Sequence, residues 1–495
     1  MKKRIFIYLA VTLVFLLFCQ KSFSQEPEFI PESRVYELSL RDISDLALTN
    51  NLDIQIVKLD LYIKRNDLDI ALSLFDTFFS LYANYSDDEK EVPNVFSGTR
   101  ARVRNSGIDI IKRFPTGTEA SFGLSNMRND SNSLFFTQNP FHEMTASVSL
   151  KQSLGRNFFG LKDRSDIKIT KLDIENSEFT TLDEIELELS GVQKAYWRLV
   201  LANEELGICQ DILDEAERLY EIYKRNFEIG LIEEPDLFAT QANVKVRESE
   251  VAIAQLEVVK AQNDLLLLLS EENFEITIKP EDSLDTTSSY QDIYEALTAA
   301  VSNRRDYKQA KNALKISEIE VVAKKNSLWP QIDLEASYRR NGIDSYYKTA
   351  WQDIRKENQD EIYVGVTITN SFERKKEKAE LAQKKLEEQK ALLFLKQIEQ
   401  TVFRQINSQV TEANTFSNEV IISKEIVTLQ EQKLKAESKR LRYGRSSADI
   451  IIRYQEDVLN SRLSLARSLF NYHTSLIDLE LTKNSLLDAY WQGQL

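Results

Sequence analysis

Two short segments carry residue types that could perform a function, and both are glycine turns followed by an aspartate. The first is GLIEEPD at residues 230–236, and the second is GRSSAD at residues 444–449. Glycine lets a chain reverse tightly, and an aspartate at the start of a helix either caps it or presents a negative charge. We therefore expect two turns between helices, and both roles remain open for Asp236 and Asp449.

The chain offers little for catalysis or metal binding. It contains two histidines, His142 in an expected loop and His473 in a helical pattern, far apart in sequence. We find no Ser/His/Asp set, no phosphate-binding loop and no spacing typical of a zinc site. We therefore expect no enzyme activity, no cofactor and no bound metal, and a hydrolytic enzyme is the remotest alternative.

An internal repeat positions the two turns. ALTNNLD at residues 47–53 matches AVSNRRD at residues 300–306, and the register continues without a gap, so that Leu81 falls on Leu334. A duplication of about half the chain indicates two copies of one supersecondary unit. We therefore divide the mature chain into a first repeat over residues 25–285 and a second over residues 286–495.

Each repeat reads as the same series of elements. The first is expected to contain a helix at 38–76, strands over about 77–152 with an extra hairpin at about 101–126, a long helix at 164–229 and a return helix at 235–270. The second is expected to contain a helix at 292–328, strands over about 331–369, a long helix at 374–443 and a return helix at 447–487. Each long helix would measure roughly 100 Å, and two short helices stacked end to end would equal it.

The expected strands alternate between apolar residues and polar or small ones. Ile362, Val364 and Val366, for example, alternate with Tyr363, Gly365 and Thr367. A strand between lipid and a wet lumen has this pattern, but so does a soluble sheet with one face on a core, which the strands alone favour. The pattern does not say whether the 101–126 hairpin joins the other strands. Residues 127–143 and 340–360 are expected to be loops.

Residues 1–24 read as a secretory signal, with a basic start, an apolar stretch and a small-x-small cleavage site. A lipoprotein modified at Cys19 is the alternative, but the bulky Phe18 directly before that cysteine fits it poorly. Removal of the segment and its four basic residues takes the net charge from −15 to about −19, which argues against nucleic-acid binding. The mature chain keeps one cysteine, Cys209, expected to be a buried apolar residue. No later apolar stretch reaches the ~18 residues of a membrane helix, so any membrane span must be a closed β-barrel.

With these features the chain resembles the outer membrane efflux protein family, the TolC-like channel-tunnels, over nearly all of residues 38–487. The resemblance depends on the doubled Asn-x-x-Asp helix before a strand, on Trp329 and Pro330 at the second strand entry, and on the two glycine turns. It implies a mainly α fold with a β-barrel portion. Duplicated long-helix hairpins would form a periplasmic α-barrel, and three chains would share one outer-membrane β-barrel.

The resemblance also implies a function and partners. A homotrimer would be a passive outer-membrane duct of a tripartite efflux or type I secretion system, surrounded by outer-membrane lipid. It would contact a periplasmic adaptor (membrane fusion) protein and, through it, an inner-membrane RND or ABC transporter. The turn residues that match the family's adaptor-contact and pore-tip positions are Gly230, Leu231, Asp236, Gly444, Arg445, Ser446 and Asp449. Aspartates repeated by threefold symmetry would form an anionic ring that favours cations.

The chain departs from the family pattern at the tip. Better-known members place a latch tyrosine three residues before the second glycine and an arginine two residues after it. Here these positions hold Leu441 and Ser446, and the shifted neighbours Tyr443 and Arg445 are the candidates to substitute for the latch. The alternative to a duct is a secreted coiled-coil scaffold or adhesin without a pore, which would not insert strands into lipid.

Overall fold

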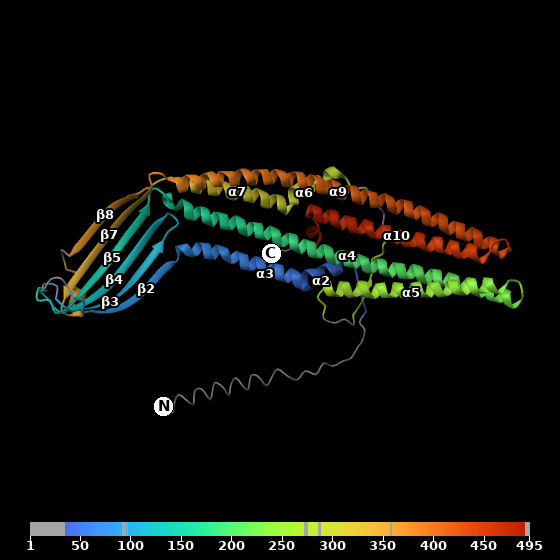
Figure 1. Ribbon diagram of the computed structural model, residues 1–495, viewed down its shortest axis with the longest axis horizontal. Coiled ribbons are helices and arrows are strands. Elements are labelled where there is room, and N and C mark those ends of the chain that lie inside the picture. Colours follow the sequence, from blue (N-terminus) through green and yellow to red (C-terminus); the bar gives the residue numbers. More distant parts are fainter. Residues whose placement is uncertain are drawn as a thin grey trace, which may run out of the picture.

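A computed structural model describes residues 35–91, 96, 98–271, 276–285, 289–356 and 359–490 of the chain. The expected signal sequence, with Cys19, lies outside the described residues. The described chain is an elongated body with a β-sheet at one end and helices that extend away from it (Figure 1). No helix among these residues is both long and apolar enough to cross a membrane.

Two helices of equal length form the frame of the elongated part. These are α4 (Leu161–Glu228) and α9 (Lys375–Arg442), with 68 residues each, where we expected helices at 164–229 and 374–443. At 1.5 Å per residue each is about 100 Å long. The return helices α5 (Glu234–Leu268) and α10 (Ala448–Lys483) pack against α4 and α9, respectively.

The expected single helix at 38–76 is wrong, because two helices occupy this segment, α2 (Leu40–Asn50) and α3 (Leu52–Leu72). The second repeat is divided in the same way, into α6 (Ile293–Asn303) and α7 (Arg305–Asn326). The break residues Asn51 and Arg304 have ψ angles of 124° and 121°, which no α-helix accommodates. Both breaks fall inside the repeated Asn-x-x-Asp motif.

All six long strands belong to one antiparallel sheet, in the order β2-β3-β4-β5-β7-β8. The strands are β2 (Thr77–Asp88), β3 (Ala101–Arg113), β4 (Thr118–Ser131), β5 (Phe141–Ser153), β7 (Gln331–Asp344) and β8 (Asp360–Thr369). The hairpin whose place was open is β3–β4, and it lies within the sheet, between β2 and β5. The second repeat joins the first through the pairing of β7 with β5.

Several segments differ from the expected loops. Strand β4 continues to Ser131, and residues 340–344 extend β7, so the expected loops at 127–143 and 340–360 are partly strand. The second loop also contains the short helix α8 (Tyr347–Asp353). A small parallel pair, β1 (Val35–Leu38) with β6 (Thr277–Pro280), joins the start of the first repeat to the link between the repeats. Its four-residue strands are too short to show a period in the sequence.

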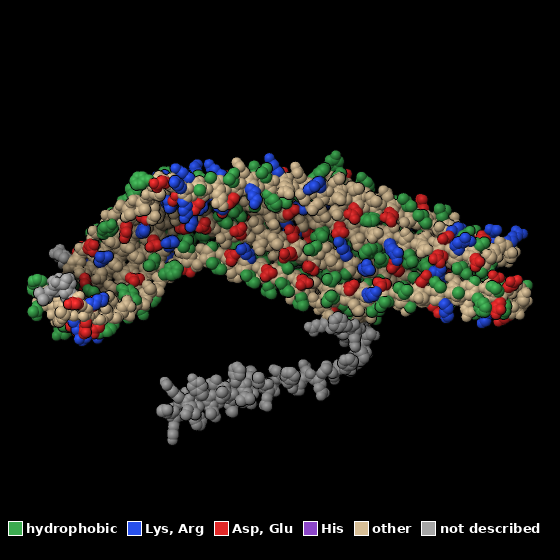
Figure 2. Space-filling view, in the orientation of Figure 1, with side chains coloured by type: hydrophobic (Ala, Val, Ile, Leu, Met, Phe, Trp, Pro, Cys, Tyr) green, Lys and Arg blue, Asp and Glu red, His purple; other side chains and the backbone are tan. Residues whose placement is uncertain are grey.

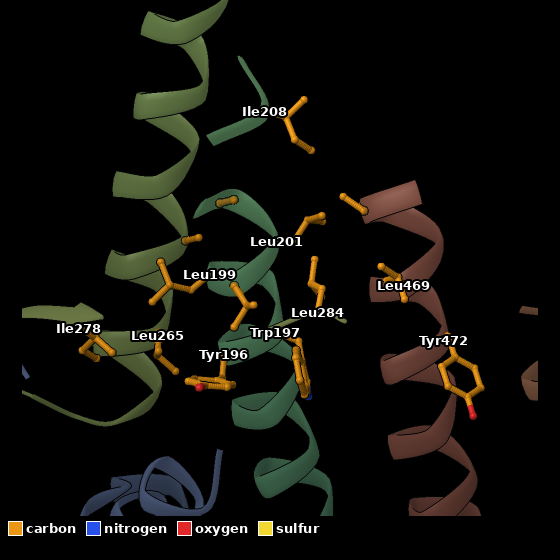
Figure 3. Close-up of a cluster of buried hydrophobic side chains, with 14 of the residues drawn as sticks. Tyr196, Trp197, Leu199, Leu201, Ile208, Leu265, Ile278, Leu284, Leu469 and Tyr472 are labelled. Carbon is orange, nitrogen blue, oxygen red and sulfur yellow. The ribbon is translucent and has the colours of Figure 1, made fainter. Parts of the chain in front are cut away.

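The largest core lies where α4 packs against α5 and α10, and Figure 3 shows the part of it around Tyr196 and Trp197. Tyr196 and Trp197 of α4 are both buried there, with Leu265 of α5 and Tyr472 of α10 around them. The Tyr196 hydroxyl donates to a carboxylate oxygen of Asp282 at 2.8 Å, so its polar end is satisfied. Cys209 is buried and free, as expected. This core fixes the helices that carry the turns.

Candidate functional site: the helix tips and the two faces of the sheet

The two glycine turns lie together at the end of the body far from the sheet, where α4 turns into α5 and α9 into α10 (Figure 1). Gly230 and Gly444 both adopt left-handed backbone, with φ of 73° and 67°. The N–H of Leu231 donates to the Asn226 carbonyl at 2.8 Å, and the N–H of Arg445 donates to the Arg440 carbonyl at 2.9 Å. Both bonds close a Schellman motif, so one turn is built twice.

The glycines are required by backbone conformation and not by crowding. A Cβ atom added to Gly230 or Gly444 would meet nothing within 4 Å, whereas the positive φ disfavours every L-residue with a side chain. The neighbouring Leu231 and Tyr443 are 71% and 79% exposed. Each turn thus presents a large apolar side chain beside an uncrowded backbone, which suits contact with a partner.

The two aspartates lie in the first turns of the return helices and not at their N-cap positions. Those positions are held by Glu233 and Ser447, whose side chains make no capping hydrogen bond. Of the two roles left open, hydrogen-bonded capping by Asp236 and Asp449 is therefore wrong in the N-cap sense. Their carboxylates still favour the positive end of each helix dipole.

Tyr223 lies near both tips, although the sequence analysis did not single it out. It lies on α4, one heptad before Gly230, and is 6% exposed. Burial raises the pKa of Tyr223, and the nearby carboxylates of Asp236 and Asp449 raise it further. Because these aspartates belong to α5 and α10, Tyr223 lies where both return helices begin. Its seven-residue spacing from the glycine was the available signal, although such spacing marks any buried helix stripe.

The tips carry opposite charge (Figure 2). The α4–α5 tip is rich in carboxylates, Glu228, Glu233, Glu234 and Asp236. The α9–α10 tip is rich in basic residues, Lys439, Arg440, Arg442 and Arg445. Opposite charges at neighbouring tips attract each other, and the attraction weakens with salt.

The positions of the family's latch are occupied differently. Leu441 packs against the core, and the Ser446 hydroxyl oxygen has no hydrogen-bond partner among the described residues. Arg445 forms no ion pair with any part of the chain that the structure describes. The exposed Tyr443 and Arg445 are therefore free, within one chain, to reach a neighbouring copy.

The sheet has two faces of different chemistry. One row across it consists of large apolar side chains, in strand order Phe79, Ile110, Phe122, Val148, Tyr338 and Ile362. The adjacent row, on the other face, consists of polar or small residues, Ser80, Asp109, Gly123, Ser147, Arg339 and Glu361. A membrane barrel needs an apolar outside and a polar lumen, and this sheet supplies both.

Acidic residues predominate on the polar face. The pairing places seven carboxylates there, Asp88, Asp109, Glu119, Glu143, Asp333, Glu335 and Glu361. It places three basic residues there, Arg113, Lys151 and Arg339. Seven negative and three positive charges leave a net charge of −4 on this face of each chain. A lumen lined by it would favour cations.

Neither histidine has the surroundings of a catalytic group. His142 lies on β5 beside the ring of Tyr347. His473 stacks on Trp197 with 3.8 Å between ring centroids, and burial lowers its pKa. Within the described ranges, no group of three or more His, Cys, Asp and Glu residues could hold a metal ion. The turns and the sheet faces are the features with a functional arrangement.

Comparisons with known proteins agree with the family resemblance found in the sequence. Residues 114–271 match the family model described as outer membrane efflux protein. No curated protein matches the chain.

Solved structures match nearly its whole length. The CmeC outer membrane channel of Campylobacter jejuni has 15% identity and a TM-score of 0.62, covering 90% of this chain and 85% of that one. The open MtrE outer membrane channel of Neisseria gonorrhoeae has 16% identity and a TM-score of 0.65, covering 94% and 95%. The outer membrane protein VceC of Vibrio cholerae has 14% identity and a TM-score of 0.63, covering 91% and 95%. Similarity at this level of identity establishes a shared fold.

Proposed function

We propose that this chain, a member of the outer membrane efflux protein family by its match over residues 114–271, forms an export duct through the outer membrane and the periplasm. The observation that carries the proposal is that one sheet, with an apolar and a polar face, continues into two 68-residue helices that end in paired tips. Such helices extend roughly 100 Å from the sheet. The duct guides its cargo and carries out no reaction on it.

The partners follow from this role. Channels of the family are trimers that work with adaptors and inner-membrane pumps, and we extend each of these partners to this chain. A periplasmic adaptor would bind the tips around Gly230 and Gly444, where Leu231 and Tyr443 are exposed. An RND or ABC transporter would deliver the cargo, in tripartite efflux or in type I secretion. The secretory signal expected at residues 1–24 agrees with a location in the outer membrane.

Electron microscopy of the protein extracted in detergent from the membrane fraction tests this proposal. We expect a threefold cylinder longer than about 100 Å, with a detergent belt at the end that holds the sheet. A monomeric or dimeric rod in the soluble fraction would overturn the proposal. That result would leave the secreted coiled-coil scaffold or adhesin as the explanation of the long helices.

A further inference from the structure

The six-stranded sheet has two long edges without a partner in the described chain. Strand β2 has 12 residues and β8 has 10, and each is paired on one side only. Edges exposed to water are usually protected by proline, bulges or charge. Here neither strand contains proline, and their middle positions, such as Leu81 and Val364, are uncharged. These edges are suited to pairing with another chain.

The internal duplication indicates how the edges would pair. Helices α4 and α9 have equal length and follow the left-handed residues Gly160 and Arg374, a spacing of 214 positions. Helices α3 and α7 follow the break residues Asn51 and Arg304, a spacing of 253 positions. Strand β8 precedes α9 as β5 precedes α4, and β2 follows α3 as β7 follows α7. The observed pairing of β5 with β7 is thus a template for pairing β8 with β2.

From this template we infer that β8 of one copy pairs with β2 of the next, and that three copies close one 18-stranded barrel. Each residue of the observed pair Leu150–Ala336 is replaced by its counterpart in the other repeat, using the two spacings above. Val364 of one copy then lies opposite Ala83 of the neighbouring copy. This inference rests on the proposed trimer and adds the strand number, the register and the place of the β3–β4 hairpin in the wall.

The chemistry of the two sheet faces tests the inferred register independently of the repeat spacings. In the inferred register Val366 meets Leu81 and Ile368 meets Phe79, so apolar residues meet across the junction. On the other face Thr367 meets Ser80. A slip by one residue would place these apolar side chains on the polar face, and such slips are strongly disfavoured where the faces differ. The apolar belt and the polar lining therefore both continue around the barrel.

The strand number has a consequence for transport. Three copies of a six-stranded sheet give 18 strands, and barrels of about 16–18 strands enclose an aqueous channel. Six of the 18 strands come from the three copies of the β3–β4 hairpin. A barrel of this strand number leaves an aqueous channel through the membrane.

Cysteine cross-linking tests the register. We expect Ser80→Cys with Thr367→Cys to form disulfide-linked dimers and trimers under oxidising conditions, because the pair corresponds to the observed neighbours Ser153 and Asp333. Asn84→Cys with Tyr363→Cys is a second pair in the same register. Leu81→Cys with Thr367→Cys is the matched control, since its residues point to opposite faces, and it should not cross-link. Cross-linking of the control in place of the two predicted pairs would overturn the register.

Electron microscopy of the same protein separates this inference from the proposed function. A threefold cylinder with 18 strands in its wall supports both. A threefold cylinder whose wall excludes the β3–β4 hairpin overturns the inference and leaves the duct standing. Absence of any trimer overturns the proposed function as well. A cross-linked trimer ladder from either predicted cysteine pair would rule out the last result.

Discussion

Replacement of Arg305 by methionine should destabilise the junction between the two repeats. Glu186 of α4 is completely buried and accepts from Arg305 Nη1 at 2.5 Å, Asn484 Nδ2 at 2.9 Å and the N–H of Leu487 at 3.1 Å. Without Arg305 a buried carboxylate keeps only two neutral donors. Breaking a buried ion pair in this way costs about 3–5 kcal/mol. The neighbouring Asp183, with its side chain 35% exposed, adds little because water solvates it.

A double variant separates the charge from the shape of the site. Arg305→Met with Glu186→Gln removes both charges but keeps an acceptor for the N–H of Leu487. We expect it to recover more than half of the loss, because a buried pair replaced on both sides is often close to neutral. Lys194→Met is the matched control, since the Lys194–Asp478 pair joins α4 to α10 at 2.5 Å but is about one third exposed. Its loss should stay below about 1 kcal/mol.

The measurement is urea unfolding of the purified protein in detergent, followed by the helical signal in circular dichroism. The midpoint should fall clearly for Arg305→Met, return most of the way in the double variant, and hardly move for Lys194→Met. The reasoning is refuted if the urea midpoint of Arg305→Met is the same as that of the control, Lys194→Met. It is also refuted if the double variant is as unstable as the single one, because the loss would then come from packing and not from an unpaired charge.

Three further outcomes are expected. Because burial lowers the pKa of His473, the unfolded chain binds its proton first as the pH falls, so the urea midpoint should decline below about pH 6.5 and His473→Gln should flatten this slope. Gly230→Ala should cost about 1 kcal/mol through its positive φ, whereas Gly207→Ala, in open space within α4, should stabilise by roughly 0.5–1 kcal/mol in the same assay. In planar bilayers under a salt gradient, the net charge of −4 on each polar face should give a reversal potential that favours cations, and Asp109→Asn should reduce it. A preference for anions would contradict the assignment of that face to the lumen.

The sequence predicted the long helices well because their evidence is local. A stripe that includes Ile185, Leu189 and Val192 repeats over many turns, and all three residues are buried in the core. The glycine turns were also predictable from nearby residues, since a helix end and a positive φ favour glycine at one position within a few residues. These elements needed no information about distant partners.

Other features depend on partners far away in the chain. Alternation in β3 and β4 shows two faces but not which strands lie beside them, so the place of the hairpin in the sheet was out of reach. Tyr223 looks like any residue of an apolar stripe until Asp236 and Asp449 are brought beside it. The family resemblance supplied the tips as sites. The structure adds that the two oppositely charged tips are neighbours, and it places Glu233 and Ser447, not the two aspartates, at the N-cap positions.

The helix breaks at Asn51 and Arg304 connect the short helices to the ends of the return helices. A return helix ends with carbonyls that lack partners, and the next short helix must begin at the same place. Asn51 meets both needs, because its Oδ1 accepts from the N–H of Ile54 at 2.9 Å while its Nδ2 donates to the Leu268 carbonyl at the end of α5 at 2.7 Å. In the second repeat Arg304 donates from Nη1 to the Thr482 carbonyl at the end of α10 at 3.4 Å.

The two repeats thus use different side chains for one purpose. At each break the end of a return helix meets the start of a short helix, α5 with α3 and α10 with α7, and each pair runs beside a helix about 100 Å long. A continuous helix at 38–76, as the periodicity suggested, would leave the end of α5 without this contact. The interruption in the repeated motif therefore gives a carbonyl at the end of each return helix a hydrogen-bond donor at the point where the next short helix begins.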